Sequence, residues 1–199
     1  MNDILTSYQK ELNEQLVIDE FTLKDVQLQL PGRRHLWVGR LMRHKHELNQ
    51  LKKEKTEKLI ELTRMLNSLE NISIIITGSK SESELCKEFE ISNSVINLSG
   101  ILNLSLLKAL INKASVFISN STGPMHIAAA LGVHVIGFFP KILACSQKRW
   151  GPYTEKKTLF VPTIDCSNCT REQCEKLNCM NSIDIGKVFD NTKTVLRIL

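Results

Sequence analysis

The chain has 199 residues, of which 42% are hydrophobic and 24% are charged, a composition typical of a soluble globular protein with a core of normal size. It begins without a basic segment followed by an apolar run. Its most apolar stretch, residues 127–139, is also far shorter than the roughly 20 residues of a membrane helix. We therefore expect neither a signal peptide nor a membrane span, and we expect the protein in the cytoplasm.

The net charge of +5 is concentrated in residues 33–58, which hold nine Lys/Arg and three Glu. Such a basic segment can meet nucleic acid, anionic lipid headgroups or a phosphorylated substrate, and it can equally be the solvated face of a helix. Trp37 is its only aromatic residue, and the chain has no recognised DNA- or RNA-binding motif. We therefore expect no nucleic-acid partner.

The first third of the chain shows two patterns. Residues 26–30 alternate as in a short strand and stop at Pro31-Gly32, a turn signal. Residues 44–69 favour a helix, in which one face carries four leucines, Leu59, Leu62, Leu66 and Leu69.

From residue 72 onward, strand and helix patterns alternate regularly. We predict strands over residues 72–77, 95–98, 116–119 and 133–138. Between them we predict helices over residues 82–89, 104–114 and 124–131, the last ended by Gly132. This alternation indicates an α/β fold, with a Rossmann-like parallel sheet and helices on both faces.

The most informative stretch is the turn that joins the strand at 116–119 to the helix at 124–131. Ser121 or Thr122 can cap this helix, and Pro124 suits its first position because its missing N–H would be unpaired there anyway. Gly123 has no side chain, so a ligand can approach the backbone closely. The free N–H groups and the helix dipole then favour an anion such as phosphate, to which His126 can add a donor.

Two alternatives stay open for this turn. The Ser/Thr/Gly pattern by itself is equally that of a well-capped helix that binds nothing. His126 by itself fits a capped or half-buried histidine better than a ligand contact.

Residues 120–132, Asn-Ser-Thr-Gly-Pro-Met-His-Ile-Ala-Ala-Ala-Leu-Gly, closely resemble the signature of the glycosyltransferase family 9 heptosyltransferases. Four further stretches resemble the family in order: residues 76–78 followed by Glu82, residues 100–114, which resemble the helix before the signature, residues 149–153, and a cysteine-bearing tail that leads to Ile183. The resemblance covers about residues 56–199.

The resemblance implies one half of a GT-B enzyme, in which two Rossmann-like domains enclose the active site. The matching half would bind the nucleotide-sugar donor, an ADP-heptose-like molecule, through Ser121, Thr122, Gly123, Pro124, Met125 and His126 at the diphosphate, and Gly78 and Glu82 near the ribose or base. Catalysis in the family is inverting and uses no metal or other cofactor. The base is a carboxylate of the other domain, so the resemblance assigns no catalytic residue here. The acceptor would be the lipopolysaccharide core or another glycolipid, with peripheral membrane contact at the inner face of the inner membrane.

The chain departs from the family in three ways. Ser121 stands where the family commonly has Asp, which changes the charge of the phosphate cradle. Residues 1–55 are too few for an acceptor domain, so we expect a linker and remnant there and the nucleotide-sugar-binding domain over residues 56–199. We also do not find the family's first strand of this domain, with its glycine-bearing loop and phosphate-binding lysine.

Six cysteines occur, of which four lie in residues 166–179: Cys166, Cys169, Cys174 and Cys179. Four thiolates can bind zinc, but the four-residue gaps are less typical of zinc sites and no His lies nearby. We therefore predict no metal and a compact loop with free thiols, with a zinc site as the alternative. Cys86 should lie in the core, and Cys145 has no evident partner.

Three functions follow from these patterns. The first is a heptosyltransferase-type glycosyltransferase, truncated before its acceptor domain. The second is a module or inactive remnant that binds a nucleotide diphosphate without turnover. The third is an interaction protein held together by zinc, which only the cysteines support.

Overall fold

The computed structural model describes residues 34–38, 49–164 and 179–198. Within these residues, six strands form one sheet in the order β3-β2-β1-β4-β5-β6. The strands are β1 (Arg34–Val38), β2 (Ile72–Ile76), β3 (Val95–Asn97), β4 (Val116–Asn120), β5 (His134–Phe138) and β6 (Lys157–Phe160). Every neighbouring pair is parallel, as the strand–helix alternation predicts.

The sheet is buried on both faces, which explains its apolar, β-branched strands. All five residues of β2 are buried. Because side chains alternate along a strand, Ile74 and Ile76 join the core on one face while Ile75 joins the core on the other. Phe117 in β4 lies on the same face as Ile75.

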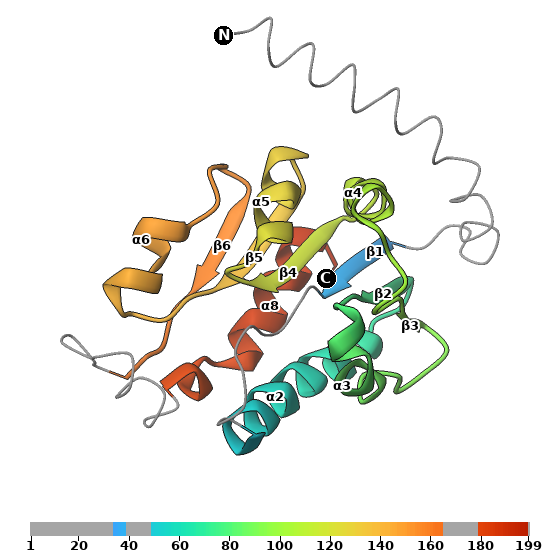
Figure 1. Ribbon diagram of the computed structural model, residues 1–199, viewed down its shortest axis with the longest axis horizontal. Helices are drawn as coiled ribbons and strands as arrows, with labels where there is room; N and C mark the ends of the chain where they lie inside the picture. The colour runs from blue at the N-terminus through green and yellow to red at the C-terminus, as the bar shows by residue number, and fades with distance from the viewer. Residues whose placement is uncertain (1–33, 39–48, 165–178, 199) are drawn as a thin grey trace, which may run out of the picture.

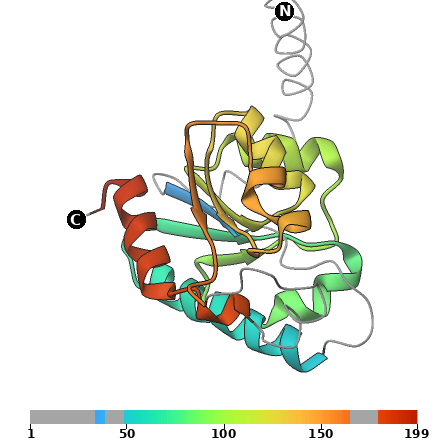
Figure 2. The same cartoon turned by 90° about the vertical axis from the view of Figure 1, so that its left-hand side faces the viewer.

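Helices cover both faces of the sheet (Figures 1 and 2). Helices α2 (Asn49–Asn67), α3 (Ser83–Lys87) and α8 (Ile185–Leu196) pack on the face of Ile74. Helices α4 (Leu104–Asn112) and α5 (Gly123–Ala130) pack on the face of Ile75. The four-residue α6 (Gln147–Trp150) lies beside β6 (Figure 1). Short 3-10 turns, η1 (Lys80–Glu82), η2 (Leu143–Cys145) and η3 (Cys179–Ser182), complete the described elements.

The leucine face predicted for residues 44–69 is confirmed within α2. Leu62 and Leu66 are fully buried, Leu59 is 8% exposed, and Leu69 packs against the same core. Burying a leucine contributes about 1.5–3 kcal/mol, so this face holds α2 to the sheet.

The strand β1 was not predicted from the sequence. It pairs with β2 from Arg34↔Ile72 onward and with β4 from Leu36↔Val116 onward, which places it in the middle of the sheet. The sheet therefore draws on residues before position 56. The segment Arg-His-Leu-Trp-Val begins with two polar residues inside the basic stretch 33–58, so it does not stand out as a buried strand. The strand expected over residues 26–30 lies outside the described residues, as do residues 1–33 of the expected linker.

The other predicted elements form, with small differences at their ends. The predicted strands are confirmed as β2 to β5, whereas β6 was not predicted, because Lys157-Thr158-Leu159-Phe160 mixes polar and apolar residues. α5 begins at Gly123, which places Pro124 second in the helix, not first. Gly132 has a φ of +74° just past the end of α5, so its predicted role is confirmed. Among the helices described, none is both long and apolar enough to pass through a lipid bilayer.

Candidate functional site

The carboxyl ends of the parallel strands meet at one edge of the sheet. β1 and β4 are neighbours there, but α2, the next described helix after β1, lies on one face, and α5, which follows β4, lies on the other. In open parallel sheets such a change of side leaves a crevice beyond the strand ends, and ligands bind in it. The turn from Asn120 to Thr122 ends β4 at this position.

Hydroxyl groups fix the turn after β4. The Ser119 side chain is 2% exposed, and its Oγ donates to the carbonyl oxygen of Asn120 at 2.7 Å. The same Oγ lies 3.1 Å from Oγ1 of Thr122. Thr122 stands at the N-cap of α5 with extended backbone, but its hydroxyl makes no capping bond to the helix. Thr122 is therefore the N-cap residue, as one of the two predicted candidates, but its hydroxyl contacts Ser119 and not an N–H of the helix.

The residues predicted to bind the diphosphate differ in their exposure. Ser121, Gly123 and His126 are exposed, and Thr122 and Pro124 are partly buried. A Cβ atom added to Gly123 would meet no heavy atom within 4 Å, so the space in front of this backbone is open. His126 is thus exposed and not half-buried, contrary to one of the alternatives above.

Met125 belongs to the core and does not face the turn. Its side chain is fully buried among the residues between α5 and the sheet, and its sulfur lies 3.4 Å from a Cβ built on Gly137. Its N–H donates to the carbonyl of Thr122 at 3.1 Å. Its side chain therefore does not face the open space in front of Gly123, and Met125 as a donor-binding residue stays a prediction.

A second group of loops follows β2 and β3 at the same edge. One carboxylate oxygen of Glu82, Oε2, accepts from the N–H of Ser79 at 2.7 Å and from the Ser79 hydroxyl at 2.5 Å. A Cβ added to Gly78 would lie 3.0 Å from Sγ of Cys86 and 3.3 Å from Cβ of Glu82. The absence of a side chain at Gly78 therefore lets the Glu82 segment pack against the end of β2. Ser79, which fixes the Glu82 carboxylate, is not among the residues predicted from the sequence.

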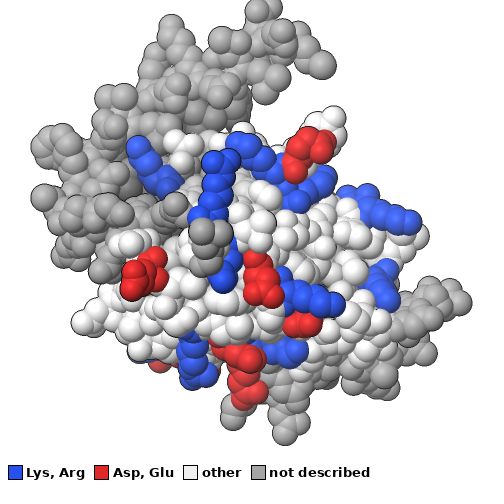
Figure 3. All heavy atoms as spheres, turned by 180° about the vertical axis from the view of Figure 1, so that it is seen from behind, with Lys and Arg blue, Asp and Glu red and all other residues white. Residues whose placement is uncertain are grey.

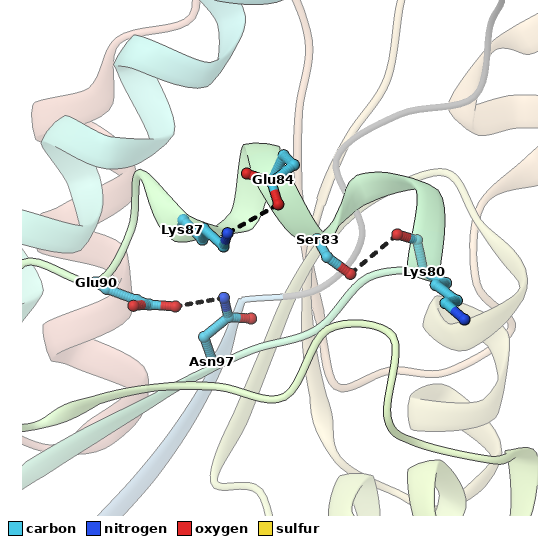
Figure 4. A network of polar contacts seen from close by, with 6 residues as sticks. All are labelled: Lys80, Ser83, Glu84, Lys87, Glu90 and Asn97. Atoms are coloured by element: carbon cyan, nitrogen blue, oxygen red, sulfur yellow. Dashed lines mark hydrogen bonds and ion pairs between the residues drawn. The ribbon is translucent and has the colours of Figure 1, made fainter.

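The loops after β2 and β3 are also joined to each other. The N–H of Gly100 donates to the carbonyl of Gly78 at 2.9 Å. Figure 4 shows further polar contacts around α3: Ser83 to the Lys80 carbonyl at 3.0 Å, Lys87 to Glu84 at 2.8 Å, and Asn97 to Glu90 at 2.7 Å. The Lys87 and Glu84 side chains are 60% and 86% exposed, so this ion pair adds little stability. These contacts position α3 and the end of β3.

Cys86 lies in the core, as predicted. It is 5% exposed, and burial raises the pKa of its thiol, an effect that a hydrogen bond with Ser99 partly offsets and that the Glu82 and Glu90 charges reinforce. The thiol therefore stays protonated at neutral pH. Cys145 is exposed, and like Cys86 it is a free cysteine.

A small hollow lies behind the turn, on the face of α2 and α8. Lys58 Nζ donates there to the carbonyl oxygens of Asn181 and Ile183, which ties η3 and the residue after it to α2. The hollow is mainly apolar and is lined by Lys58, Leu59, Asn120, Phe138, Met180, Asn181, Ile183 and Ile185. Asn120, the last residue of β4, is among these lining residues, so the hollow reaches the carboxyl end of that strand.

The cysteine cluster is described only at its end. Cys166, Cys169 and Cys174 lie outside the described residues, and Cys179 is 1% exposed at the start of η3. Within residues 34–38, 49–164 and 179–198, no three His, Cys, Asp or Glu side chains come together as a metal site would require. Whether the four cysteines bind zinc stays a hypothesis.

Known proteins share this chain's sequence pattern and fold. The family profile Glycosyltransferase family 9 (heptosyltransferase) matches residues 9–180. Lipooligosaccharide heptosyltransferase 2 of Campylobacter jejuni is 26% identical over 140 residues, which cover 66% of this chain and 43% of the relative.

Two solved structures resemble the fold. E. coli ADP-heptose LPS heptosyltransferase II has a TM-score of 0.64 at 18% identity, over 84% of this chain and 47% of that one. E. coli heptosyltransferase WaaC with ADP has a TM-score of 0.61 at 17% identity, over 83% and 45%. The chain thus spans about half the length of these relatives, and its sheet is the Rossmann-like sheet of GT-B glycosyltransferases. Because the profile covers most of the chain, the chain belongs to glycosyltransferase family 9.

Proposed function

We propose that the chain is the donor-binding half of a heptosyltransferase-type glycosyltransferase, which transfers a sugar from a nucleotide diphosphate such as ADP-heptose to a lipopolysaccharide core acceptor. The observation that carries this proposal is the open backbone of Gly123 at the N-terminus of α5, just beyond the carboxyl end of β4. An anion is stabilised there by N–H groups and by the positive end of the helix dipole.

In the proposed site, two loops bind different parts of the donor. The turn of Thr122, Gly123 and His126 holds the diphosphate, to which the exposed His126 ring adds a donor. Glu82, held by Ser79, accepts from the ribose hydroxyls at the end of β2. Ser121 in place of the family's usual Asp leaves the cradle without a negative charge, which reduces repulsion of the diphosphate and can change the preferred donor.

The proposed reaction needs a second half. A carboxylate of the acceptor domain removes the proton of the acceptor hydroxyl, whose oxygen attacks the anomeric carbon and inverts it. The bond from that carbon to the diphosphate breaks, and the leaving charge is stabilised by the turn before α5. We assign no catalytic base to this chain, and the proposed mechanism uses no metal.

We also propose where this chemistry takes place. A lipopolysaccharide or other glycolipid acceptor is anchored in a bilayer, so the protein would work in the cytoplasm at the inner face of the inner membrane and contact that membrane peripherally. The basic residues 33–58 and the family match support this location.

Calorimetric titration with ADP tests the donor site. We expect the parent chain to bind ADP and Gly123→Val to bind at least tenfold more weakly, because a branched side chain would stand where the phosphate approaches. The open space at Gly123 means that this substitution should leave the fold unchanged. Ala130→Val is the matched control: it adds a branched side chain at the exposed far end of α5 and should bind ADP like the parent. A parent chain that binds none of ADP, GDP and UDP would contradict the proposal.

The second candidate function is a module that holds a nucleotide diphosphate without turnover. It requires only the turn before α5 and the Glu82 carboxylate held by Ser79, and no catalytic base. Both candidates predict ADP binding, so only an assay of sugar transfer separates them.

A further inference from the structure

The connection between β5 and β6 carries large apolar side chains that are exposed on the protein surface. Leu143 is 72% exposed, Trp150 48% and Tyr153 fully exposed. Residues 141–157 also contain five Lys/Arg and one Glu, a net charge of +4. We call this set the α6 surface: Lys141, Leu143, Lys148, Arg149, Trp150, Tyr153, Lys156 and Lys157.

The α6 surface is held in place by its own contacts. Trp150 Nε1 donates to the Ala144 carbonyl at 2.9 Å, which joins α6 to η2, and the Arg149 guanidinium lies 5.6 Å from the centre of the Trp150 ring. Lys157 Nζ donates to the Pro152 carbonyl at 3.1 Å, which joins the start of β6 to the segment after α6. The exposed apolar residues therefore belong to a folded unit.

The α6 surface lies at one end of the sheet. α6 is beside β6, which is the strand at the end opposite β3 (Figure 1). Lys and Arg side chains project on the same side when the molecule is seen from behind (Figure 3, right).

We propose that the α6 surface binds a membrane through anionic lipid headgroups. Tryptophan and tyrosine beside Lys and Arg fit the bilayer interface, where the rings enter the headgroup region and the cations meet lipid phosphates. The core of a protein interface is depleted in lysine, and a nucleic-acid backbone offers nothing for Leu143 to bury. The inference rests on the peripheral membrane contact proposed above and does not depend on nucleotide binding.

Sedimentation with lipid vesicles tests the apolar part of the α6 surface. The parent should bind vesicles that contain phosphatidylglycerol, bind pure phosphatidylcholine vesicles far more weakly, and lose binding as salt is added. Trp150→Ala with Tyr153→Ala should weaken binding at least tenfold. The matched control is Ile101→Ala with Leu104→Ala, which removes two exposed apolar residues (68% and 62%) at the loop after β3 and the start of α4 and should bind like the parent.

Charge variants test the basic part. Lys148→Gln with Arg149→Gln should weaken binding by roughly fivefold for each cation removed. Lys113→Gln with Lys187→Gln removes two exposed cations from α4 and α8 and should have a smaller effect. Equal losses in the two pairs would mean attraction by net charge alone, which would overturn the assignment to the α6 surface.

Tryptophan fluorescence gives a second, direct measurement. The chain has two tryptophans, so the emission of Trp150 is the difference between the parent and Trp150→Phe. This difference should shift to shorter wavelength on anionic vesicles.

Unchanged vesicle binding in the Trp150→Ala, Tyr153→Ala variant would overturn the inference about this surface, and no vesicle binding by the parent would overturn the membrane contact as well. The same variants are also titrated with ADP. Absence of ADP binding would contradict the proposed donor site and not the inference about the α6 surface.

Discussion

At the residue scale, neighbouring positions of one motif have different tasks. Gly123 and Met125 both lie in the stretch that resembles the family signature, yet Gly123 faces open space and Met125 is fully buried. The signature could be read from the sequence, but the direction of each side chain could not, because it depends on how α5 is rotated against the sheet. Ser79 is the opposite case. A serine after a strand is common, and only the 2.5 Å contact to Glu82 shows that it positions a carboxylate.

Two glycines with positive φ allow a stability prediction at single residues. Gly132→Ala should destabilise the fold by about 1–2 kcal/mol, the cost of left-handed backbone, because its φ is +74° and its added Cβ meets no atom within 4 Å. Gly100→Ala should cost more, because its φ is +78° and its Cβ would also lie 2.7 Å from Ser83 Oγ and 3.1 Å from Lys80 Cα. Urea unfolding measures both.

Gly123→Ala is the control for this pair, since its position is open and its φ is not positive. It should leave stability nearly unchanged. If Gly100→Ala cost no more than Gly132→Ala, the loops after β2 and β3 would be less tightly joined than the structure shows.

At the element scale, the sequence predicts those strands whose residues are nearly all apolar. β2 and β4 are such strands, and their predicted limits differ from the structure by one residue at their carboxyl ends. β1 and β6 escape prediction because a short segment with polar residues becomes a strand only when neighbouring strands supply its hydrogen bonds. Tertiary context of this kind overrides local propensity. β1 thus adds a strand before β2, and Gly39 follows it in the sequence.

The contact between β5 and β6 predicts a dependence of stability on pH. His134 Nε2 lies 3.0 Å from Thr158 Oγ1, and burial, followed by the charge of Lys156, lowers the pKa of His134. The unfolded chain then takes up the proton more readily than the folded one, so stability is full above the ordinary pKa of about 6.5 and falls as the pH drops through the folded value.

We expect the urea midpoint of the parent to decrease from pH 7.5 to pH 5.5, and His134→Gln to reduce this decrease. Other titrating groups act alike in both proteins, so the difference between the two pH profiles isolates His134. Parallel profiles would show that the His134 contact does not contribute.

At the scale of the whole molecule, predicting that a domain binds a donor is different from predicting that it completes the reaction. The parallel fold follows from the strand–helix alternation and the family from one long signature, whereas activity depends on residues beyond those that match here.

Mixing this chain with a separately produced acceptor half of a family 9 relative should restore sugar transfer from ADP-heptose to a lipid acceptor. Mass spectrometry of the acceptor measures the transfer, and Gly123→Val should abolish it. ADP binding without transfer in the mixture would favour the binding module.

The central place of β1 also affects how the sheet can assemble. Of the strands that the structure describes, β1 comes first in sequence. It stands between β2 and β4, so within the described sheet the two sides are joined through β1. A shorter chain that started at residue 56 would keep β2 with β3, and β4 with β5 and β6, but would leave an unpaired strand edge on each. Such edges pair readily with other chains and aggregate. In the full chain, the closing of the sheet requires contacts between residues far apart in sequence, and contacts of this kind slow folding.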